Sequence, residues 1–448
     1  MKTRIIHFFE VLSSNFWVIP LLLLISGAGL AFLNVYLDKT LYARHIELPE
    51  LYLYFNSASN IRTLLSVSAT SILGVAGVSF SITIASLTLA SQQFGPRLLR
   101  NFMSDRFNQL VLGCFIGTFL YCILMLQFTG SMELDKTTPF FSMMSLLTIL
   151  IFNLLLLVFF IHHIAVAIQA ETVITEVNNE LVTQMNCTFP NKADKSSQSI
   201  QLDIPDDLTK KFEQKGEDIY STTSGYLQAI DTDNLVKCAT DNDYVIKFII
   251  KPGDFILTNS VIAHCLASEQ IEEIEKDINT HLLIGSEGTP EQDPEFAVRQ
   301  LVEVAVRALS PGINDPFTAI SCIKKLGENI AFLMQRQFPT QYHLDDSGQL
   351  RLELKPFTFR GIVDTSFDQI RQHGKNDIAV VICLLQMLNK LILQSQTKEH
   401  MEALKVQAEA ISSVNTDDVI ALKDKEDIKE LYDVINVSLN TKESTLLT

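Results

Sequence analysis

Four long apolar stretches occupy the first 170 positions of the chain, and polar or charged segments separate them. Each stretch is long enough to cross the ~30 Å hydrocarbon core of a bilayer as a helix. The pattern predicts spans at residues 16–37, 64–91, 108–128 and 140–168. The first stretch is longer than the apolar core of a secretory signal peptide, so we expect it to remain in the mature protein as a transmembrane helix.

The second span differs from an ordinary lipid-facing helix, because small and polar residues recur along one of its sides. On a helix that advances ~100° per residue, these positions fall within an arc of ~100°. The stripe consists of Ser66, Thr70, Gly74, Gly77, Ser81, Ala85, Thr88 and Gln92. Two interpretations are open. Either the stripe packs against other helices through its small residues, or it lines a path for water and solute.

After residue 170 the pattern becomes that of a water-soluble region. We expect a helical extension and linker over 171–200, a small β-rich module over 201–267 and a mainly helical domain over 268–448. Short β-branched and aromatic runs around the Pro252-Gly253-Asp254 turn predict the strands of the module. Their order locally resembles the barrel-like hairpin of lipoyl- and biotinyl-type domains, without the lysine that carries their cofactor. The predicted fold class is therefore membrane α-helical with four transmembrane helices, plus a cytosolic α+β domain with a barrel-like β-rich module and a helical remainder.

Charge is divided unevenly between the two regions. Residues 1–170 carry nine Lys/Arg against seven Asp/Glu, whereas the remainder carries 26 against 44. An acidic domain is a poor partner for nucleic acid. Arginines cluster between the second and third spans, and with the basic N-terminus they predict cytoplasmic N- and C-termini by the positive-inside rule. These are Arg97, Arg100 and Arg106. They either orient the spans and contact lipid phosphate, or form a basic ring at the inner mouth of an oligomeric pore.

The seven cysteines show neither a CxxC pair nor metal-ligand spacing. We therefore expect reduced thiols, no disulfide and no structural zinc. The chain also lacks a phosphate-binding Walker loop, a nucleophile elbow, an HExxH metal motif and a dinucleotide fingerprint. These patterns favour a protein that is not an enzyme and that has no cofactor and no metal site.

Residues 310–316 read as a tight corner between two helices. Ser310 begins a Ser-Pro-Gly segment that ends one helix, and Asp315 can cap the next helix with Pro316 at its first position. The corner is either purely structural, or its amides bind an anion together with nearby polar side chains. The candidates for that anion site are Arg299, Arg307, Ser310 and Asn314. Alternatively, Arg299 and Arg307 flank Glu303 at intervals of four residues and form a solvated row of ion pairs.

Two segments carry a family resemblance. One runs from Phe80 to Arg106; the other comprises Gln292-Asp293, Arg299 to Glu303 and Arg307 to Pro316. Together they resemble a bacterial family of predicted inner-membrane proteins, the domain of unknown function 2254. The resemblance covers most of the chain. It implies a multi-pass protein of the bacterial cytoplasmic (inner) membrane, and it brings no established activity.

Two hypotheses for function follow from these patterns. The first is a homo-oligomeric channel or pore-like protein in the lipid bilayer, in which copies of the second span line a path and the cytosolic domain regulates it. The second is a membrane-anchored sensor or scaffold, whose cytosolic domain binds a small anionic ligand or a partner protein.

Overall fold

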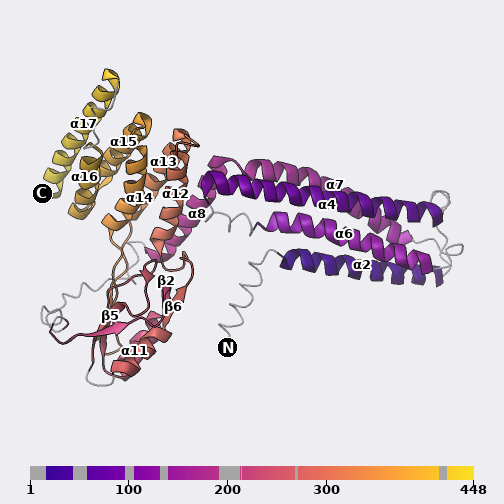
Figure 1. Ribbon diagram of the computed structural model, residues 1–448, viewed down its shortest axis with the longest axis horizontal. Helices are drawn as coiled ribbons and strands as arrows, with labels where there is room; N and C mark the ends of the chain where they lie inside the picture. Colours follow the sequence, from indigo (N-terminus) through magenta and orange to yellow (C-terminus); the bar gives the residue numbers. More distant parts are fainter. Residues whose placement is uncertain are drawn as a thin grey trace. The chain divides into compact units, whose positions relative to one another are not determined.

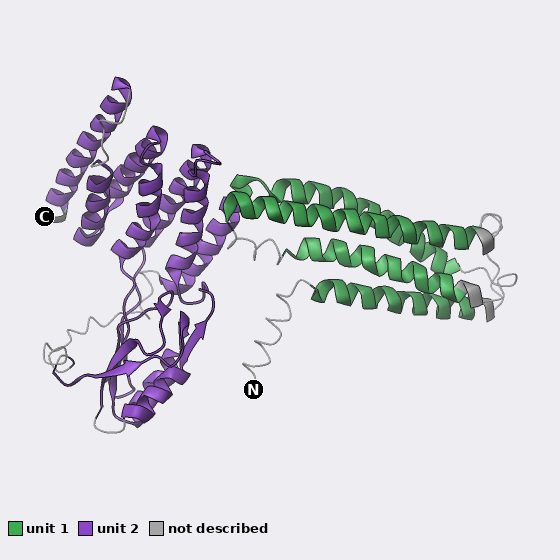
Figure 2. Cartoon of the chain, viewed as in Figure 1, with its two compact units in different colours: residues 1–172 green, residues 173–448 purple. Residues whose placement is uncertain are grey.

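The computed structural model describes residues 17–43, 58–95, 105–131, 140–190, 212, 214–267, 271–412 and 421–447. The chain divides into two compact units, residues 1–172 and residues 173–448 (Figure 2).

The described residues of unit 1 form four long helices (Figure 1). They are α2 (Val18–Ala43), α4 (Ala58–Phe94), α6 (Arg106–Ser131) and α7 (Phe140–Ala167). Each contains a segment that is long and apolar enough to cross a membrane, which confirms the four predicted spans. Some helices extend beyond the predicted spans. For example, α2 runs six residues past the predicted end of the first span.

Glycine allows the backbones of α2 and α6 to touch. A Cβ added to Gly117 would lie 2.8 Å from the carbonyl oxygen of Leu23, and one added to Gly113 would lie 2.9 Å from Cα of Pro20. Gly27 faces the carbonyl group of Gly117 in the same seam. This Gly113-x3-Gly117 contact is the small-residue packing that membrane helices use in place of hydrophobic burial.

The strands of unit 2 form two open sheets. The five-stranded sheet has the order β1-β5-β3-β8-β7 and the three-stranded sheet the order β4-β2-β6. All neighbouring strands are antiparallel except β3 and β8. Their bounds are β1 (Glu217–Tyr220), β2 (Gly225–Ile230), β3 (Val245–Phe248), β4 (Phe255–Ile256), β5 (Val261–Leu266), β6 (Leu282–Gly285), β7 (Tyr342–Leu344) and β8 (Leu350–Glu353).

The barrel-like closure expected for the β-rich module is not observed among the described strands. Each sheet keeps two edge strands that pair on one side only. Three of the strands, β6, β7 and β8, come from beyond residue 267 and complete the sheets. Two short helices, α10 (Thr232–Asp241) and α11 (Ile271–Thr280), contribute Leu235 and Ile278 to the core that the strands share.

The rest of unit 2 is helical. Its helices are α8 (Ala170–Thr188), α12 (Pro294–Ala308), α13 (Pro316–Leu333), α14 (Phe359–Gly374), α15 (Ile378–Gln394), α16 (Lys398–Ser412) and α17 (Leu422–Leu447). Side-chain caps define the starts of several helices. Asp293, Asp315, Thr358 and Asp377 each accept a hydrogen bond from a backbone N–H in the first turn. In Figure 1, α12 to α17 stand side by side as a row of helices.

Candidate functional site

The predicted stripe forms one exposed face of α4. All eight stripe residues are exposed, from Ser66 to Gln92. The opposite face is buried within unit 1 and consists mainly of Ile61, Leu65, Ala69, Ile72 and Ala76. A Cβ added to Gly74 or Gly77 would meet nothing within 4 Å. Among the described residues, the stripe therefore does not pack against the other helices of its own chain.

Three hydroxyl groups of the stripe are hydrogen-bonded inside α4. Thr70 Oγ1 donates to the carbonyl oxygen of Ser66 at 3.0 Å, Ser81 Oγ to that of Gly77 at 2.9 Å, and Thr88 Oγ1 to that of Ile84 at 2.9 Å. Each hydroxyl oxygen retains acceptor capacity on its outer side. The stripe is thus a narrow, weakly polar face that another helix or water can approach closely.

The basic residues beside the stripe are only partly within the described structure. Arg97 and Arg100 lie outside the described residues, whereas Arg106 is the first residue of α6 and is exposed. The preceding Asp105 accepts the backbone N–H of Phe107 at 2.9 Å and lies 2.6 Å from Nε2 of His163 in α7. A carboxylate therefore stands next to Arg106, and the basic ring stays a prediction.

A buried polar network in unit 1 was not predicted. Asp38 is 8 % exposed, and its carboxylate accepts the backbone N–H groups of Phe141 and Ser142 at 2.7 and 3.1 Å. Tyr121 donates its hydroxyl to the carbonyl oxygen of Ser142 at 2.8 Å and accepts from Asn34 at 3.1 Å. A side chain of α2 thus caps the N-terminus of α7, where a negative charge is favourable.

In unit 2, the Gln292-Asp293 and Arg299 motif fastens α12 to the sheets. Asp293 caps α12, is 1 % exposed and pairs with Arg299. Gln292 accepts the N–H of Ile230 at 2.9 Å and donates to its carbonyl oxygen at 3.2 Å. Arg299 therefore forms its ion pairs with acids at the start of α12, Asp293 and Glu295.

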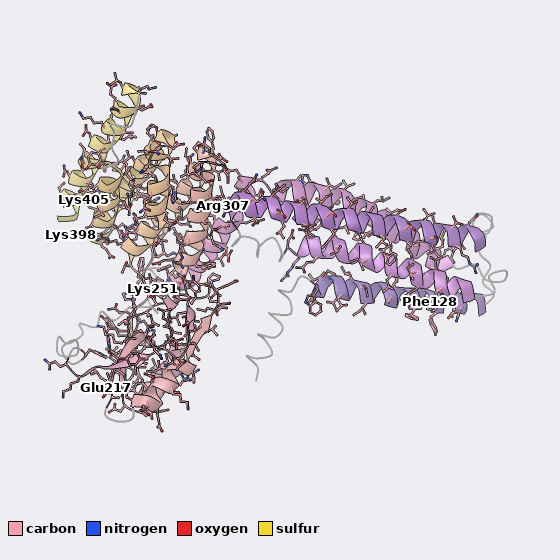
Figure 3. All side chains as sticks on the ribbon, in the orientation of Figure 1. Phe128, Glu217, Lys251, Arg307, Lys398 and Lys405 are labelled. Atoms are coloured by element: carbon pink, nitrogen blue, oxygen red, sulfur yellow. The ribbon has the colours of Figure 1, made fainter. Side chains whose placement is uncertain are left out.

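The buried carboxylates continue this cluster toward the β3–β4 turn. Glu295 is 6 % exposed and lies 2.7 Å from Nζ of Lys251, which Figure 3 labels. Gly253 has a φ of 96°, and a Cβ there would collide with the carboxylate of Asp293. Burial raises the pKa of the Asp293 carboxyl from 3.8 to about 6, although the Arg299 guanidinium opposes the shift. We call Lys251, Asp293, Glu295 and Arg299 the ionic cluster.

The structure brings three of the four candidate anion-binding residues to the α12–α13 corner. Ser310 Oγ donates to the carbonyl oxygen of Arg307 at 2.7 Å, and the N–H of Asn314 donates to that of Ser310 at 2.9 Å. Asp315 caps α13 and Pro316 is its first residue, as predicted. Arg299 lies two turns before Arg307, ~12 Å along the helix, and belongs to the ionic cluster instead.

Three potential metal ligands approach one another between α10 and α11. Donor atoms of Cys238, Asp277 and His281 lie within 4.8 Å of one another. They are already engaged, because Asp277 accepts the Tyr244 hydroxyl at 3.5 Å and His281 Nδ1 lies 3.0 Å from the carbonyl oxygen of Asp277. Burial, and then the Asp277 carboxylate, raises the pKa of the Cys238 thiol, which disfavours a thiolate ligand. The absence of a metal site stays a prediction.

Comparison with known proteins decides the family. Residues 13–390 match the family model described as "Predicted membrane protein (DUF2254)". The chain belongs to this family. The match reaches from the first span into α15, so both units are part of the family pattern. The suspected resemblance is thereby confirmed, and the four apolar helices agree with the family's description.

Related proteins occur in mycobacteria. Over 334 residues the chain is 30 % identical to an uncharacterised protein of Mycobacterium bovis and to one of Mycobacterium tuberculosis. The match covers 73 % of this chain and 62 % of each relative, so the chain spans less than two thirds of their length. No solved structure matches the chain.

Proposed function

We propose that this protein is a homo-oligomeric, channel-like protein of the bacterial cytoplasmic membrane, in which copies of α4 meet along the stripe. The exposure of all eight stripe residues carries this proposal. The side of α4 that suits close helix approach faces away from the other described helices of unit 1, which supports a contact with further copies. In the same proposal the protein is not an enzyme, both termini are cytoplasmic and unit 2 regulates the path.

The spacing of the stripe supports a regular arrangement of copies. Its seven steps from Ser66 to Gln92 cover 26 residues, ~3.7 residues per step. This spacing is close to the 11-residue repeat of ~3.67 residues per turn, which keeps a stripe in line on a right-handed supercoil. Small-residue contacts between membrane helices favour the same hand. Copies of α4 would therefore cross with a right-handed twist.

The chemistry of the stripe suits an uncharged lining. Its hydroxyl oxygens can accept hydrogen bonds from water, and Gly74 and Gly77 leave space beside the helix. A neutral, hydroxyl-lined path discriminates only weakly between positive and negative charge. In the proposed channel, selectivity comes from Arg97, Arg100 and Arg106 near the end of the stripe.

The test compares two glycines at which an added side chain would meet no neighbouring atom of the protomer. Gly77 lies on the stripe and Gly29 lies on the exposed side of α2, and a Cβ at either position meets nothing within 4 Å. Replacement of either glycine by leucine therefore leaves the packing of the protomer intact. We expect discrete conductance steps from the wild type and the Gly29→Leu variant in planar bilayers, and none from the Gly77→Leu variant. Mass measurement in detergent reports the number of subunits for all three.

The outcomes separate the two parts of the proposal. A stable oligomer that is electrically silent across voltages and membrane tensions overturns the channel and leaves the α4 contact. A Gly77→Leu variant with the wild-type subunit number and conductance overturns the α4 contact as well. A circular dichroism spectrum that matches the wild type checks that the variant is folded.

A further inference from the structure

The α12–α13 corner exposes two large apolar side chains. Phe317 is 80 % exposed and Ile313 is 38 % exposed. Gly312 lies between them and the end of α12, and a Cβ added to it would meet nothing within 4 Å. Phe and other large apolar side chains on the exposed side of a segment are typical of surfaces that insert at a membrane interface.

The corner between α14 and α15 lies beside the α12–α13 corner and adds basic residues. A Cβ added to Gly374 at the end of α14 would lie 3.3 Å from Cδ1 of Leu309, which follows α12. At the opposite end of these helices, a Cβ on Gly361 would lie 3.4 Å from Oε1 of Glu295. α12 and α14 therefore run parallel and end together. We call residues 307–317 together with residues 371–377 the corner end of unit 2.

The charge of the corner end differs from that of the acidic region around it. Three Arg/Lys side chains, Arg307, Arg371 and Lys375, stand there with His373 against two acids, Asp315 and Asp377. Both acids cap helices and accept the N–H groups of Thr318 and Val380, respectively. Arg371 also donates to Asp368 at 3.1 Å. Residues 171–448 as a whole carry 26 basic against 44 acidic side chains, so the corner end is locally suited to an anionic surface.

Contacts between α8 and α13 show at which end of unit 2 the α12–α13 corner lies. Asn329 donates to Asn178 Oδ1 at 2.7 Å, and Arg336 donates to Asn186 Oδ1 at 2.6 Å. Residue numbers thus rise together along both helices, which therefore run in the same direction. The starts of α8 and α13 lie at the same end of unit 2, and Figure 1 shows α8 running beside α12 and α13.

Chain connectivity ties this end to a membrane span. α7 ends at Ala167 and α8 begins at Ala170. Three residues extend over at most ~11 Å, so α8 starts within that distance of the end of a transmembrane helix. The first residues of α13 share this end of unit 2, so the covalent chain leaves them within reach of the bilayer surface.

We propose that the corner end of unit 2 docks on the lipid bilayer, with Ile313 and Phe317 inserted at the interface and Arg307 and Lys375 facing anionic headgroups. Apolar insertion and basic side chains are the two terms that hold peripheral segments at membranes. The contact restrains unit 2 against the membrane from which its first helix emerges. It is independent of whether the protein conducts.

The test uses the single tryptophan of the chain, Trp17. In a full-length Trp17→Phe background, a Phe317→Trp substitution places a fluorescent reporter at the corner end. A matched control carries Phe255→Trp, at a 57 % exposed position on β4. Both proteins are reconstituted in nanodiscs of anionic lipid, with and without bromine on the acyl chains. Bromine quenches tryptophan emission only over short distances.

We expect brominated lipid to cause a loss of emission from the Phe317→Trp reporter and none from the Phe255→Trp control. Lys375→Gln in the reporter background should lessen the loss in anionic nanodiscs at low salt. Equal emission of the Phe317→Trp reporter in both lipids overturns the proposal. Blue-shifted emission without quenching also overturns it, because protein rather than lipid then covers Phe317.

Discussion

Replacement of Asp293 by asparagine tests whether the ionic cluster makes stability depend on pH. The carboxyl is 1 % exposed, and burial raises its pKa from 3.8 to about 6. A shift of about two pKa units corresponds to ~3 kcal/mol at ~1.4 kcal/mol per unit. The folded state binds this proton more tightly than the unfolded state. The favourable contribution is therefore complete below about pH 4 and is lost as the pH rises through about 6.

The measurement is hydrogen exchange of α12 in the full chain, in detergent, from pH 4 to pH 8. At each pH the free energy of opening is compared between the wild type and the Asp293→Asn variant. We expect the wild type to lose stability relative to the variant by up to ~3 kcal/mol between pH 4 and pH 7. The matched control is Thr358→Ala, which removes the cap of α14 and involves no titratable group. Its difference from the wild type should not vary over the same range.

Two results would refute the reasoning. An Asp293→Asn difference that stays constant with pH would mean that the buried carboxyl does not titrate in this window. A wild type that gains stability relative to the variant as the pH rises would mean that Arg299 and Lys251 outweigh burial. In that case the cluster would act as an ordinary salt bridge whose acid has a lowered pKa.

Three further predictions concern packing, capping and metal. Gly117→Ala should lower the thermal stability of the detergent-solubilised protein by ~1–3 kcal/mol, because its Cβ would lie 2.8 Å from the carbonyl oxygen of Leu23. Gly29→Ala, off the stripe and with nothing within 4 Å, is the control and should not lower the melting temperature. Asp38→Ala should destabilise unit 1 by ~1–2 kcal/mol through loss of the α7 cap, measured by thermal unfolding; an unaltered transition would contradict the capping role. Chelator or added Zn²⁺ should not shift the melting temperature, because the Asp277 carboxylate already accepts the Tyr244 hydroxyl and His281 Nδ1 already contacts a backbone carbonyl; a drop with chelator that Zn²⁺ reverses would instead reveal a metal site.

Local signals in the sequence predicted local features well. The apolar spans follow from length and composition alone. Asp315 and Pro316 occupy the cap and first position of α13, because the residue types that begin helices are distinctive. The exposed stripe on α4 also agrees with helical periodicity, which places Ser66 to Gln92 on one side whatever surrounds the helix.

Features that depend on distant partners were not predictable in this way. Asp38 lies just past the predicted end of the first span, and no local signal marks it as a helix cap, because the N–H groups that donate to it lie more than 100 residues later, at Phe141 and Ser142. The sequence predicts a mainly helical domain over 268–448, although Leu282–Gly285 pairs with β2 as strand β6. The sequence leaves Arg299 either in an anion site or in a row with Glu303 and Arg307; no local signal indicates its pairing with Asp293, whose burial only the folded unit provides. The two open sheets were missed for the same reason, since strands from three separate segments complete them.

Unit 1 has two surfaces with regularly spaced small residues, the α2–α6 seam and the α4 stripe, and the two differ in length. In the α2–α6 seam, Gly113 and Gly117 stand one helical turn apart, ~6 Å, and backbone touches backbone there. The α4 stripe has the same kind of spacing but extends over 26 residues, ~39 Å, which exceeds the hydrocarbon core. A single steep crossing of two helices keeps contact over only a few turns near the crossing point. A surface that stays small and polar over the whole span suits several α4 helices wound around a common axis, where each remains in contact along its length. The length of the stripe therefore favours a ring of copies over a crossed pair, and a subunit number above two is the expected result of the mass measurement.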